Sequence, residues 1–474
     1  MTDALYVPHP APPPLARLEA NPVMMQAAEL IAAWRAGRNM LNVIHPESAE
    51  RRWRVARAGG LRMITVNDAG LARRILSENA ANYRKSHMYH ALLADMIGPT
   101  ASLISDGETA RFKRRLIAPA FNARALKRLE GVVEAHVAAA LDRWAAAPDG
   151  VVTLSAEAPR LAMEIAMDAF FSATLGERAG RLAALLDETM DAAGSPSVAD
   201  VLDLPGWVPR KSRRVVRRNI AEIDALLYDL IDARRETATD HIPEDADMLD
   251  VLVRARDPET GARLSRQEVR NETITLFLAG HETTALSIAW GFDRLAREPA
   301  MQAAVASEAA AAEAERGRPV GAAEARGVPL IAETYDEMLR LYPPAFVIGR
   351  IAVAADRFED LDIRPEDQFL IATFLLHRNE RYWDRPGAFD PTRFRSGPKS
   401  PAFMPFGAGP RNCVGMAMAR MEAHLLLARL LARFRLEPVG PPPEPLGKVT
   451  LRTRDPVRVR LVPAARENSG PSGE

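Results

Sequence analysis

The sequence predicts a mainly helical (α+β) protein folded as one large unit. Most of the chain is rich in Ala, Leu, Arg and Glu, and its apolar residues recur at helical spacing, as in Ala221 to Ala233 and Met416 to Phe434. Strand patterns are few, and no internal repeat or long Gly/Ser linker divides the chain. We therefore expect a helical domain with a long central helix and a small β-sheet region.

The elements follow in order along the chain. Residues 1–20 contain the proline-rich segment Pro8 to Pro14 and are expected to form an extended lead-in, and residues 466–474 a flexible tail. Residues 21–465 are then one domain. The stretch of low hydrophobicity from Gly317 to Pro329 is the segment that fits a single domain least well. Alternating or β-branched patterns predict strands at Arg62 to Val66, Ile348 to Val353, Phe369 to Phe374 and Val457 to Val462.

Composition limits the function classes. The 474 residues include 62 Lys plus Arg and 62 Asp plus Glu, which excludes a basic arm for nucleic acid or an acidic tail as the main feature. With 47% hydrophobic and 26% charged residues the chain is an ordinary globular protein. The first residues, Met1 to Ala20, lack the continuous apolar stretch of a signal peptide or membrane anchor. We expect a soluble, cytoplasmic protein with no nucleic acid partner and no membrane anchor.

The long central helix is predicted to begin at a capping box formed by Ser265 and Glu268 and to run to about Arg297. At 1.5 Å per residue it spans roughly 50 Å, enough to cross a whole domain. Its apolar middle, Thr275 to Trp290, carries the polar residues of Gly280 to Thr284. One interpretation is a buried helix whose threonines bond back to carbonyls one turn earlier. The other is a functional site, because a glutamate in a core needs a reason.

The cysteine loop carries the clearest chemistry. Cys413 is the one cysteine, so no internal disulfide is possible. It lies at the end of the glycine-rich loop Phe406 to Gly415 and just before a helix, where backbone N–H groups and the helix dipole favour a thiolate. Arg411 offers a cation, and the loop glycines let the backbone approach a large flat group. An iron porphyrin meets these demands. A buried structural cysteine, or the nucleophile of a hydrolase with one of the nine histidines as base, are the alternatives.

The loop residues match the pattern F-x-x-G-x-R-x-C-x-G, through Phe406, Gly409, Arg411, Cys413 and Gly415. This is the haem-binding signature of the cytochrome P450 family, and the chain resembles a soluble, bacterial-type haem-thiolate monooxygenase of that family. Three further elements stand in the family's order: Ala279 to Thr284 (AGHETT), Glu337 and Arg340 as E-x-x-R, and Arg393 within Phe389 to Phe394. The resemblance extends from near Tyr83 to near Val462.

The resemblance implies roles for individual residues. Cys413 is the axial ligand of the iron of haem b, and Glu282 and Thr283 are the acid and alcohol that deliver protons, with Thr284 structural. Glu337, Arg340 and Arg393 form a buried network that holds the cysteine loop. The further residues implied to bind the cofactor are Arg411, Arg350, Arg114, Phe406, Gly407, Gly415 and Ala279. Ala110 stands where the family has an aromatic residue or histidine, so one usual propionate contact is missing.

The implied reaction inserts one oxygen atom from O2 into an apolar small molecule such as a fatty acid, an alkane or a terpene. Its electrons come from NAD(P)H through a ferredoxin and a ferredoxin reductase. Mostly apolar pocket walls are expected at 85–103, 203–208, 276–279, 345–348 and 448–449, with Met88, Met96, Ala345, Phe346 and Val347 as candidate lining residues. A haem-thiolate isomerase, dehydratase or peroxygenase, and a haem carrier without catalysis, are alternatives.

Two basic runs stand out, Arg111 to Arg128 with seven basic residues and Arg210 to Arg218 with six. Either run is interpreted as a solvated face, and the first alternatively as a docking surface for an acidic electron donor.

Overall fold

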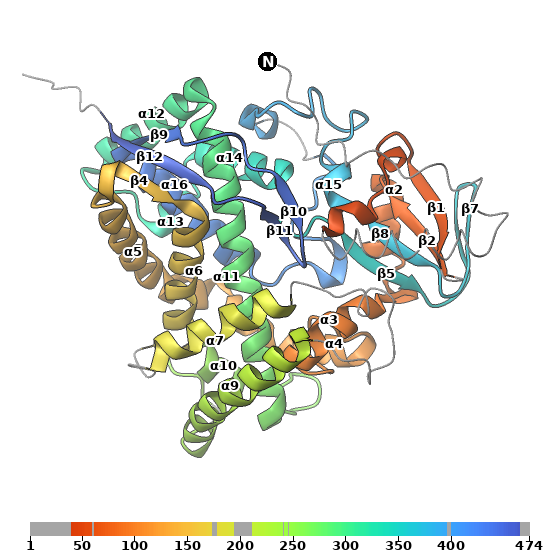
Figure 1. The fold of residues 1–474 in the computed structure, drawn as a ribbon. Helices are drawn as coiled ribbons and strands as arrows, with labels where there is room; N and C mark the ends of the chain where they lie inside the picture. Colours follow the sequence, from red (N-terminus) through yellow and green to blue (C-terminus); the bar gives the residue numbers. More distant parts are fainter. Residues whose placement is uncertain are drawn as a thin grey trace, which may run out of the picture.

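The computed structural model describes residues 39–58, 61–172, 178–193, 211–239, 241–244, 246–395 and 400–464. The predicted lead-in (1–20), the predicted tail (466–474) and the predicted pocket wall at 203–208 lie outside these residues. The described part is mainly helical with small sheets, as predicted (Figure 1).

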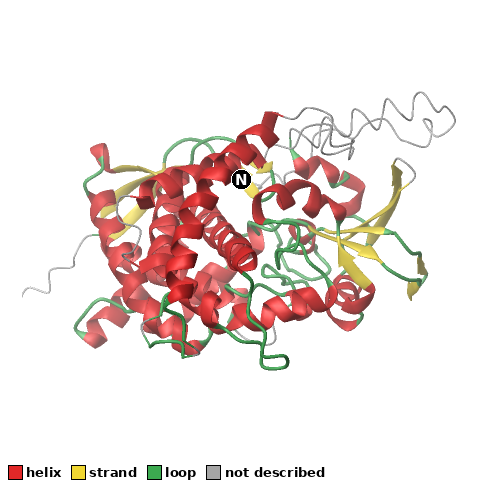
Figure 2. Cartoon of the chain, turned by 90° about the horizontal axis from the view of Figure 1, so that it is seen from below, coloured by secondary structure: helices red, strands yellow, loops and turns green. Residues whose placement is uncertain are grey.

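Helices make up the larger part of the molecule (Figure 2), and the central helix α11 (Arg266–Ala296) crosses it (Figure 1). The other principal helices are α3 (His87–Ile97), α4 (Gly107–Ile117), α5 (Ala123–Ala145), α6 (Leu154–Phe171), α7 (Arg178–Ala193), α9 (Lys211–Glu236), α10 (Met248–Arg254), α12 (Pro299–Arg316), α14 (Pro329–Leu341) and α16 (Met416–Arg433). The short helix α13 (Ala322–Ala325) lies within the stretch of low hydrophobicity, and two of its three alanines, Ala322 and Ala325, are buried in the main core.

The central helix begins where its sequence predicts. The Ser265 hydroxyl accepts from the Glu268 N–H, and the Glu268 carboxylate accepts from the Ser265 N–H, so both halves of the capping box are formed. Its 31 residues give a length of about 46 Å. Helices α6, α9, α14 and α16 pack around it and share the main hydrophobic core with it.

A five-stranded sheet lies at the end of the molecule away from α5 and α6 (Figure 1). Its strands, in the order β1-β2-β8-β5-β3, are β1 (Trp53–Ala58), β2 (Leu61–Val66), β8 (Gln368–Ile371), β5 (Ile348–Ala352) and β3 (Tyr83–Lys85). Strands β2 and β8 pair in parallel, and the other neighbours are antiparallel. Predicted strands near β2 and β5 are confirmed. The strand predicted at Phe369 to Phe374 is confirmed as β8, but its predicted end is wrong, because β8 ends at Ile371 and helix α15 (Thr373–Leu376) begins two residues later.

The remaining strands form three smaller sheets rather than joining the first. One has the order β4-β12-β9, from β4 (Val151–Thr153), β12 (Arg458–Pro463) and β9 (Phe434–Pro438). The others are the pairs β10 (Pro445–Gly447) with β11 (Leu451–Thr453) and β6 (Asp356–Phe358) with β7 (Leu361–Ile363). The strand predicted from the VRVRLV pattern is confirmed as β12. Several of the others span only three residues, too few for an alternating pattern to register.

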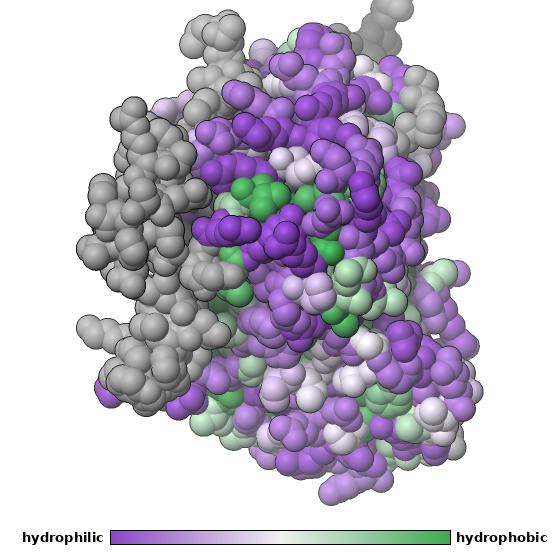
Figure 3. Space-filling model, turned by 90° about the vertical axis from the view of Figure 1, so that its right-hand side faces the viewer, coloured by the Kyte–Doolittle hydropathy of each residue, from purple (hydrophilic) through white to green (hydrophobic). Residues whose placement is uncertain are grey.

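The surface at the sheet end is mostly hydrophilic, with a few hydrophobic groups near its middle (Figure 3). Among the described helices, none combines the length and the apolar character needed to cross a membrane.

Candidate active site

The cysteine loop is closed by its own backbone and pressed against a neighbouring segment. The Cys413 N–H donates to the Phe406 carbonyl oxygen over 2.9 Å. Gly407 and Gly409 have positive φ values of 71° and 68°, which L side chains rarely adopt. A Cβ on Gly409 would lie 2.0 Å from the Leu76 carbonyl oxygen, so only glycine fits there. The glycines therefore set both the shape of the loop and its close packing on η4 (Arg74–Glu78).

The Cys413 side chain is exposed, and α16 begins three residues later at Met416. Its pKa is nevertheless raised, because protein atoms crowd the thiol and desolvate a thiolate more than the Gly415 N–H and the Arg114 charge stabilise it. In the polypeptide by itself, desolvation therefore outweighs the stabilisation of the thiolate that the sequence predicts from backbone N–H groups. A metal ion bound to the sulfur reverses this balance, since a coordinated thiol loses its proton. The Cys413 sulfur, with the Gly415 N–H and the Arg114 charge beside it, therefore suits a thiolate bound to a metal ion.

Arg114, on α4, holds the loop from the side. It donates to the Asn412 carbonyl oxygen over 2.7 Å and to Asn412 Oδ1 over 2.8 Å. Both contacts are to the residue before Cys413. The structure thus places Arg114 as a brace of the loop, where the resemblance implied a partner of the cofactor.

Cations gather where β3, β5 and the cysteine loop meet. Lys85 and Arg350 are directly opposite each other in the β3–β5 register. Arg411 donates to Asp106 over 2.9 Å, and Asp106 also accepts from the Lys85 backbone N–H over 2.9 Å. The pKa of Lys85 is lowered well below its ordinary value by burial and by the neighbouring Arg350 and Arg411. Burial likewise lowers the pKa of Arg350.

This cluster of Lys85, Arg350 and Arg411 holds three cations against the single carboxylate of Asp106. Buried positive charge of this kind is stable only with anions beside it. The two propionates of a haem supply two anions, so the cluster fits that cofactor. Ala110 is buried on α4 and offers no polar group. Sequence reasoning missed Lys85, because only strand pairing places it beside Arg350.

The centre of α11 has an interruption in its burial. Every residue from 269 to 278 is buried, then Ala279 and Gly280 are exposed, and His281 and Glu282 are buried again. A Cβ on Gly280 would have no atom within 4 Å. The Thr283 hydroxyl donates to the Ala279 carbonyl oxygen over 2.7 Å, one turn earlier. The Thr283 hydroxyl thus lies beside the exposed residues Ala279 and Gly280 in a helix whose neighbouring residues are mostly buried, and Thr284 is buried.

Glu282 bonds to the C-terminal hairpin of β10 and β11. Its Oε1 accepts from the Thr450 hydroxyl over 2.9 Å and from Arg452 Nε over 2.8 Å. The motif in the sequence gives no indication of these partners, which are about 170 residues away.

Glu337, Arg340 and Arg393 form one hydrogen-bonded group. Arg340 is fully buried and donates to both carboxylate oxygens of Glu337, over 2.7 and 2.8 Å. Arg393 Nε donates to Glu337 Oε1 over 3.2 Å. Arg340 also donates to the carbonyl oxygens of His377, Pro386 and Ala388. The group ties α14 to the segment that leads to the cysteine loop.

The predicted pocket residues separate into two kinds. Met96 and Phe346 are each only 1% exposed and pack within hydrophobic cores, and their place in the pocket wall stays a prediction. Ala345 is exposed, and Met88 and Val347 are partly buried.

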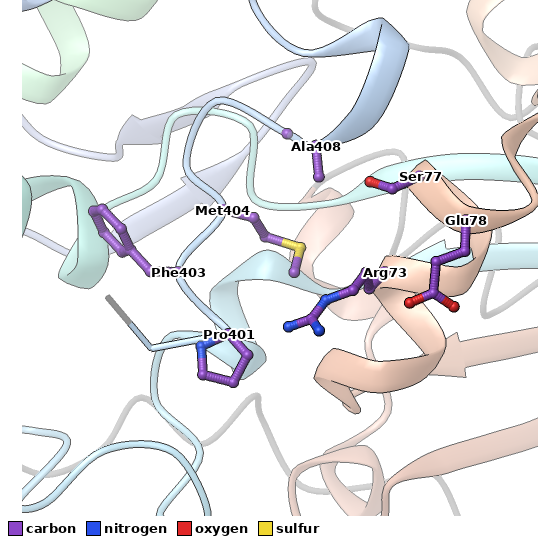
Figure 4. Close-up of a pocket in the computed structure, with 8 residues that line it drawn as sticks. Arg73, Ser77, Glu78, Pro401, Phe403, Met404 and Ala408 are labelled. Carbon is purple, nitrogen blue, oxygen red and sulfur yellow. The ribbon is translucent and has the colours of Figure 1, made fainter. Parts of the chain in front are cut away.

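A cavity of about 410 Å³ lies between the cysteine loop and the two consecutive elements α2 (Ala69–Arg73) and η4 (Figure 4). Its lining residues are Arg73, Ser77, Glu78, Pro401, Phe403, Met404, Gly407 and Ala408. Of the predicted site residues it contains Gly407 alone.

Comparison with known proteins decides the family. The family model described as Cytochrome P450 matches residues 50–460. The chain belongs to the cytochrome P450 family. It is therefore a cytochrome P450 monooxygenase, and its family implies a haem held by a cysteine thiolate. The predicted family, fold class and enzyme class are confirmed, and the hydrolase alternative is wrong.

Individual relatives are distant. The putative cytochrome P450 135B1 of Mycobacterium tuberculosis (strain ATCC 25618 / H37Rv) is 28% identical over 80% of this chain and 77% of its own length. Cyclooctat-9-en-7-ol 5-monooxygenase of Streptomyces melanosporofaciens is 30% identical over 71% of this chain and 72% of its own. The crystal structure of the cytochrome P450DA heme domain has a TM-score of 0.75 at 22% identity and covers 96% of each chain. This last similarity shows the P450 fold.

Proposed function

We propose that this P450 inserts one oxygen atom from O2 into an apolar small molecule, using electrons from a separate donor protein. The observation that carries the proposal is the pairing of two features. An exposed cysteine lies in a glycine-shaped loop, and an exposed Ala279–Gly280 step lies beside an acid and an alcohol on α11. An oxygenase needs both a thiolate ligand and a route for protons. Glu282 and Thr283 favour this function over a peroxygenase, an isomerase or a dehydratase.

Different residues of the chain would hold the haem and deliver protons. Cys413 would hold the haem iron, and Arg350, Arg411 and Lys85 its propionates. Gly407, Gly415 and Ala279, which have small side chains or none, would leave room for the macrocycle, and Phe406 would lie against it. When bound, the haem supplies the centre at which O2 is reduced and activated. Thr283 Oγ1 holds a proton beside that centre, and the Glu282 carboxylate replaces it from solvent.

For the substrate, we propose a terpene among the three apolar classes expected. The name of one relative gives cyclooctat-9-en-7-ol as the molecule that it oxygenates, and another relative is named cyclooctatin synthase. The partly buried Met88 and Val347 offer apolar surface for such a ligand.

We propose a ferredoxin, served by a reductase and NAD(P)H, as the electron donor, and the cytoplasm as the location of a single haem domain spanning residues 21–465. The basic run Arg111 to Arg128 supports docking less strongly than its sequence suggests. Arg111 pairs with Glu108, Arg115 with Asp257, and Arg124 with Glu244. Acids outside the run thus neutralise much of its charge.

The test is the absorption spectrum of the purified protein, reduced and exposed to carbon monoxide, beside a Cys413→Ser variant. We expect a strongly red-shifted Soret band that the variant loses, because serine cannot supply a thiolate. Circular dichroism of both proteins controls for folding. A band that survives the substitution, or a colourless wild-type protein, would contradict the assignment of Cys413. Product formation that needs neither O2 nor electrons would favour the isomerase alternative.

A further inference from the structure

The carboxylate of Glu282 is held by a fixed set of donors. The Thr450 hydroxyl, Arg452 Nε and Arg452 Nη2 all converge on Oε1, at 2.9, 2.8 and 2.5 Å. Charge-assisted hydrogen bonds of this kind fix the orientation of a carboxylate strongly. Both partners come from the turn and strand around β11, 168 and 170 residues after Glu282 in the sequence.

Arg452 reaches further, to α7. Its Nη1 donates to Asp191 Oδ1 over 2.6 Å. The exposed fraction of the side chain rises along this series, from 9% for Glu282 to 25% for Arg452 and 75% for Asp191. The three residues therefore connect the buried acid with the surface of the molecule.

A second contact ties the same helix to the same motif. His281 Nε2 lies 3.5 Å from Asp187 Oδ1, and Asp187 is one turn before Asp191 on α7. His281 thus contacts α7 directly, and Glu282 is connected to the next turn of α7 through Arg452. The position of α7 and the orientation of Glu282 are mechanically linked through Arg452.

We propose that Arg452 is the positioning residue for the proton-delivering acid Glu282, with Asp191 as its outer anchor. Arg452 holds Oε1 of Glu282. The second carboxylate oxygen, Oε2, is thereby left to pass protons from solvent to the Thr283 hydroxyl. This inference rests on the proposed function, in which Glu282 supplies protons for oxygen reduction.

The experiment follows the fate of O2 and needs no substrate. Holoenzyme is supplied with NADPH, a plant-type ferredoxin and its reductase as a surrogate electron supply. Reduction of O2 by two electrons takes up two protons and gives H2O2, whereas four electrons and four protons give two waters. The ratio of water to H2O2, and its solvent deuterium isotope effect, therefore report proton delivery.

We expect Glu282→Gln and Arg452→Met each to lower the ratio of water to H2O2 roughly tenfold. The double variant should fall no further, because both act through one carboxylate. Arg452→Lys should recover part of the ratio, since it keeps the charge but not the fork of donors. Asp191→Asn should lower it roughly two- to fivefold, as expected for an exposed ion pair.

The matched control is Arg454→Met, two residues along the same hairpin, where Arg454 pairs with the exposed Glu444. It should leave the ratio unchanged. A wild-type ratio in Arg452→Met, with Glu282→Gln lowered, would overturn the positioning role and leave the proposed function intact. A wild-type ratio in Glu282→Gln would overturn both. Where Arg452→Met does not accumulate as holoenzyme, an unchanged ratio in Asp191→Asn overturns the proposal.

Discussion

At the scale of single residues, the surroundings decide what each side chain can do. Cys413 sits before a helix, yet crowding raises the pKa of its thiol, so the polypeptide alone does not favour the thiolate. Lys85 is an ordinary lysine in the sequence, and burial beside Arg350 and Arg411 makes it part of a cation cluster. In both cases the residue type sets the available chemistry, and the neighbours set the state in which it is found.

Asp356 provides a residue-scale prediction about pH. Its carboxylate is 8% exposed and accepts from Arg74 Nε over 3.0 Å, Asn79 over 3.0 Å and the Tyr83 hydroxyl over 2.7 Å. The Arg74 guanidinium, helped by these hydrogen bonds, holds the pKa of Asp356 far below its usual 3.8, against the opposing effect of burial. Asp356→Asn should lower the free energy of unfolding by about 1–3 kcal/mol at neutral pH.

Because the folded-state pKa of Asp356 is depressed, the charged form stabilises the fold above the unfolded pKa, and this contribution is lost as the pH falls toward the folded value. The difference between Asp356→Asn and wild type, measured by urea unfolding, should be constant down to about pH 5 and narrow below about pH 4. Glu359→Gln, at an exposed carboxylate that pairs with Arg52, is the control and should change little. A difference independent of pH would contradict this account.

At the scale of elements, close packing of α11 on α14 fixes the site. A Cβ on Gly291 would lie 2.3 Å from Met338 Sδ, and Met338 is itself only 1% exposed. Met338 is next to Glu337, so the distance between the two helices also sets where the buried network lies. This glycine is needed for the approach of two helices, and its conformation is helical.

Gly291→Ala should therefore lower the free energy of unfolding by about 1–3 kcal/mol through overpacking, despite the better helix propensity of alanine. The matched control is Gly131→Ala on the exposed face of α5, where an added Cβ has no atom within 4 Å. That change should stabilise by about 0.5–1 kcal/mol. Thermal unfolding of the two variants under one condition gives the comparison. A stabilised Gly291→Ala would show that the helices can separate freely.

At the scale of the whole molecule, buried charges join segments that are far apart in the sequence. Arg340 connects α14 with three carbonyl oxygens between His377 and Ala388, and Glu337 accepts from the Asp390 N–H over 2.8 Å. These contacts fix the segment that precedes the cysteine loop. The loop's geometry therefore depends on a pair of charges in another part of the fold.

Arg340→Lys should destabilise the fold by about 3–5 kcal/mol, because lysine keeps the charge but leaves the buried Glu337 and several carbonyls without donors. Haem content per chain should fall together with the melting temperature. The control is Arg395→Lys, at a half-exposed arginine that pairs with Glu333, and it should change neither quantity appreciably. Full haem content and stability in Arg340→Lys would show that the network does not hold the loop.

The sequence by itself determined the family, the fold class, the start of α11 and the loop around Cys413. These features depend on local spacing: a capping box, a helical repeat, or glycines at fixed distances from a cysteine. Only the tertiary structure decided that Arg114 braces Asn412, that Lys85 joins Arg350 and Arg411, that Met96 and Phe346 are core residues, and that Arg452 holds Glu282. The physical reason is that strand register, burial and ion pairing arise between segments far apart in the sequence, 298 residues in the case of Arg114 and Asn412. No local pattern encodes which segments will meet.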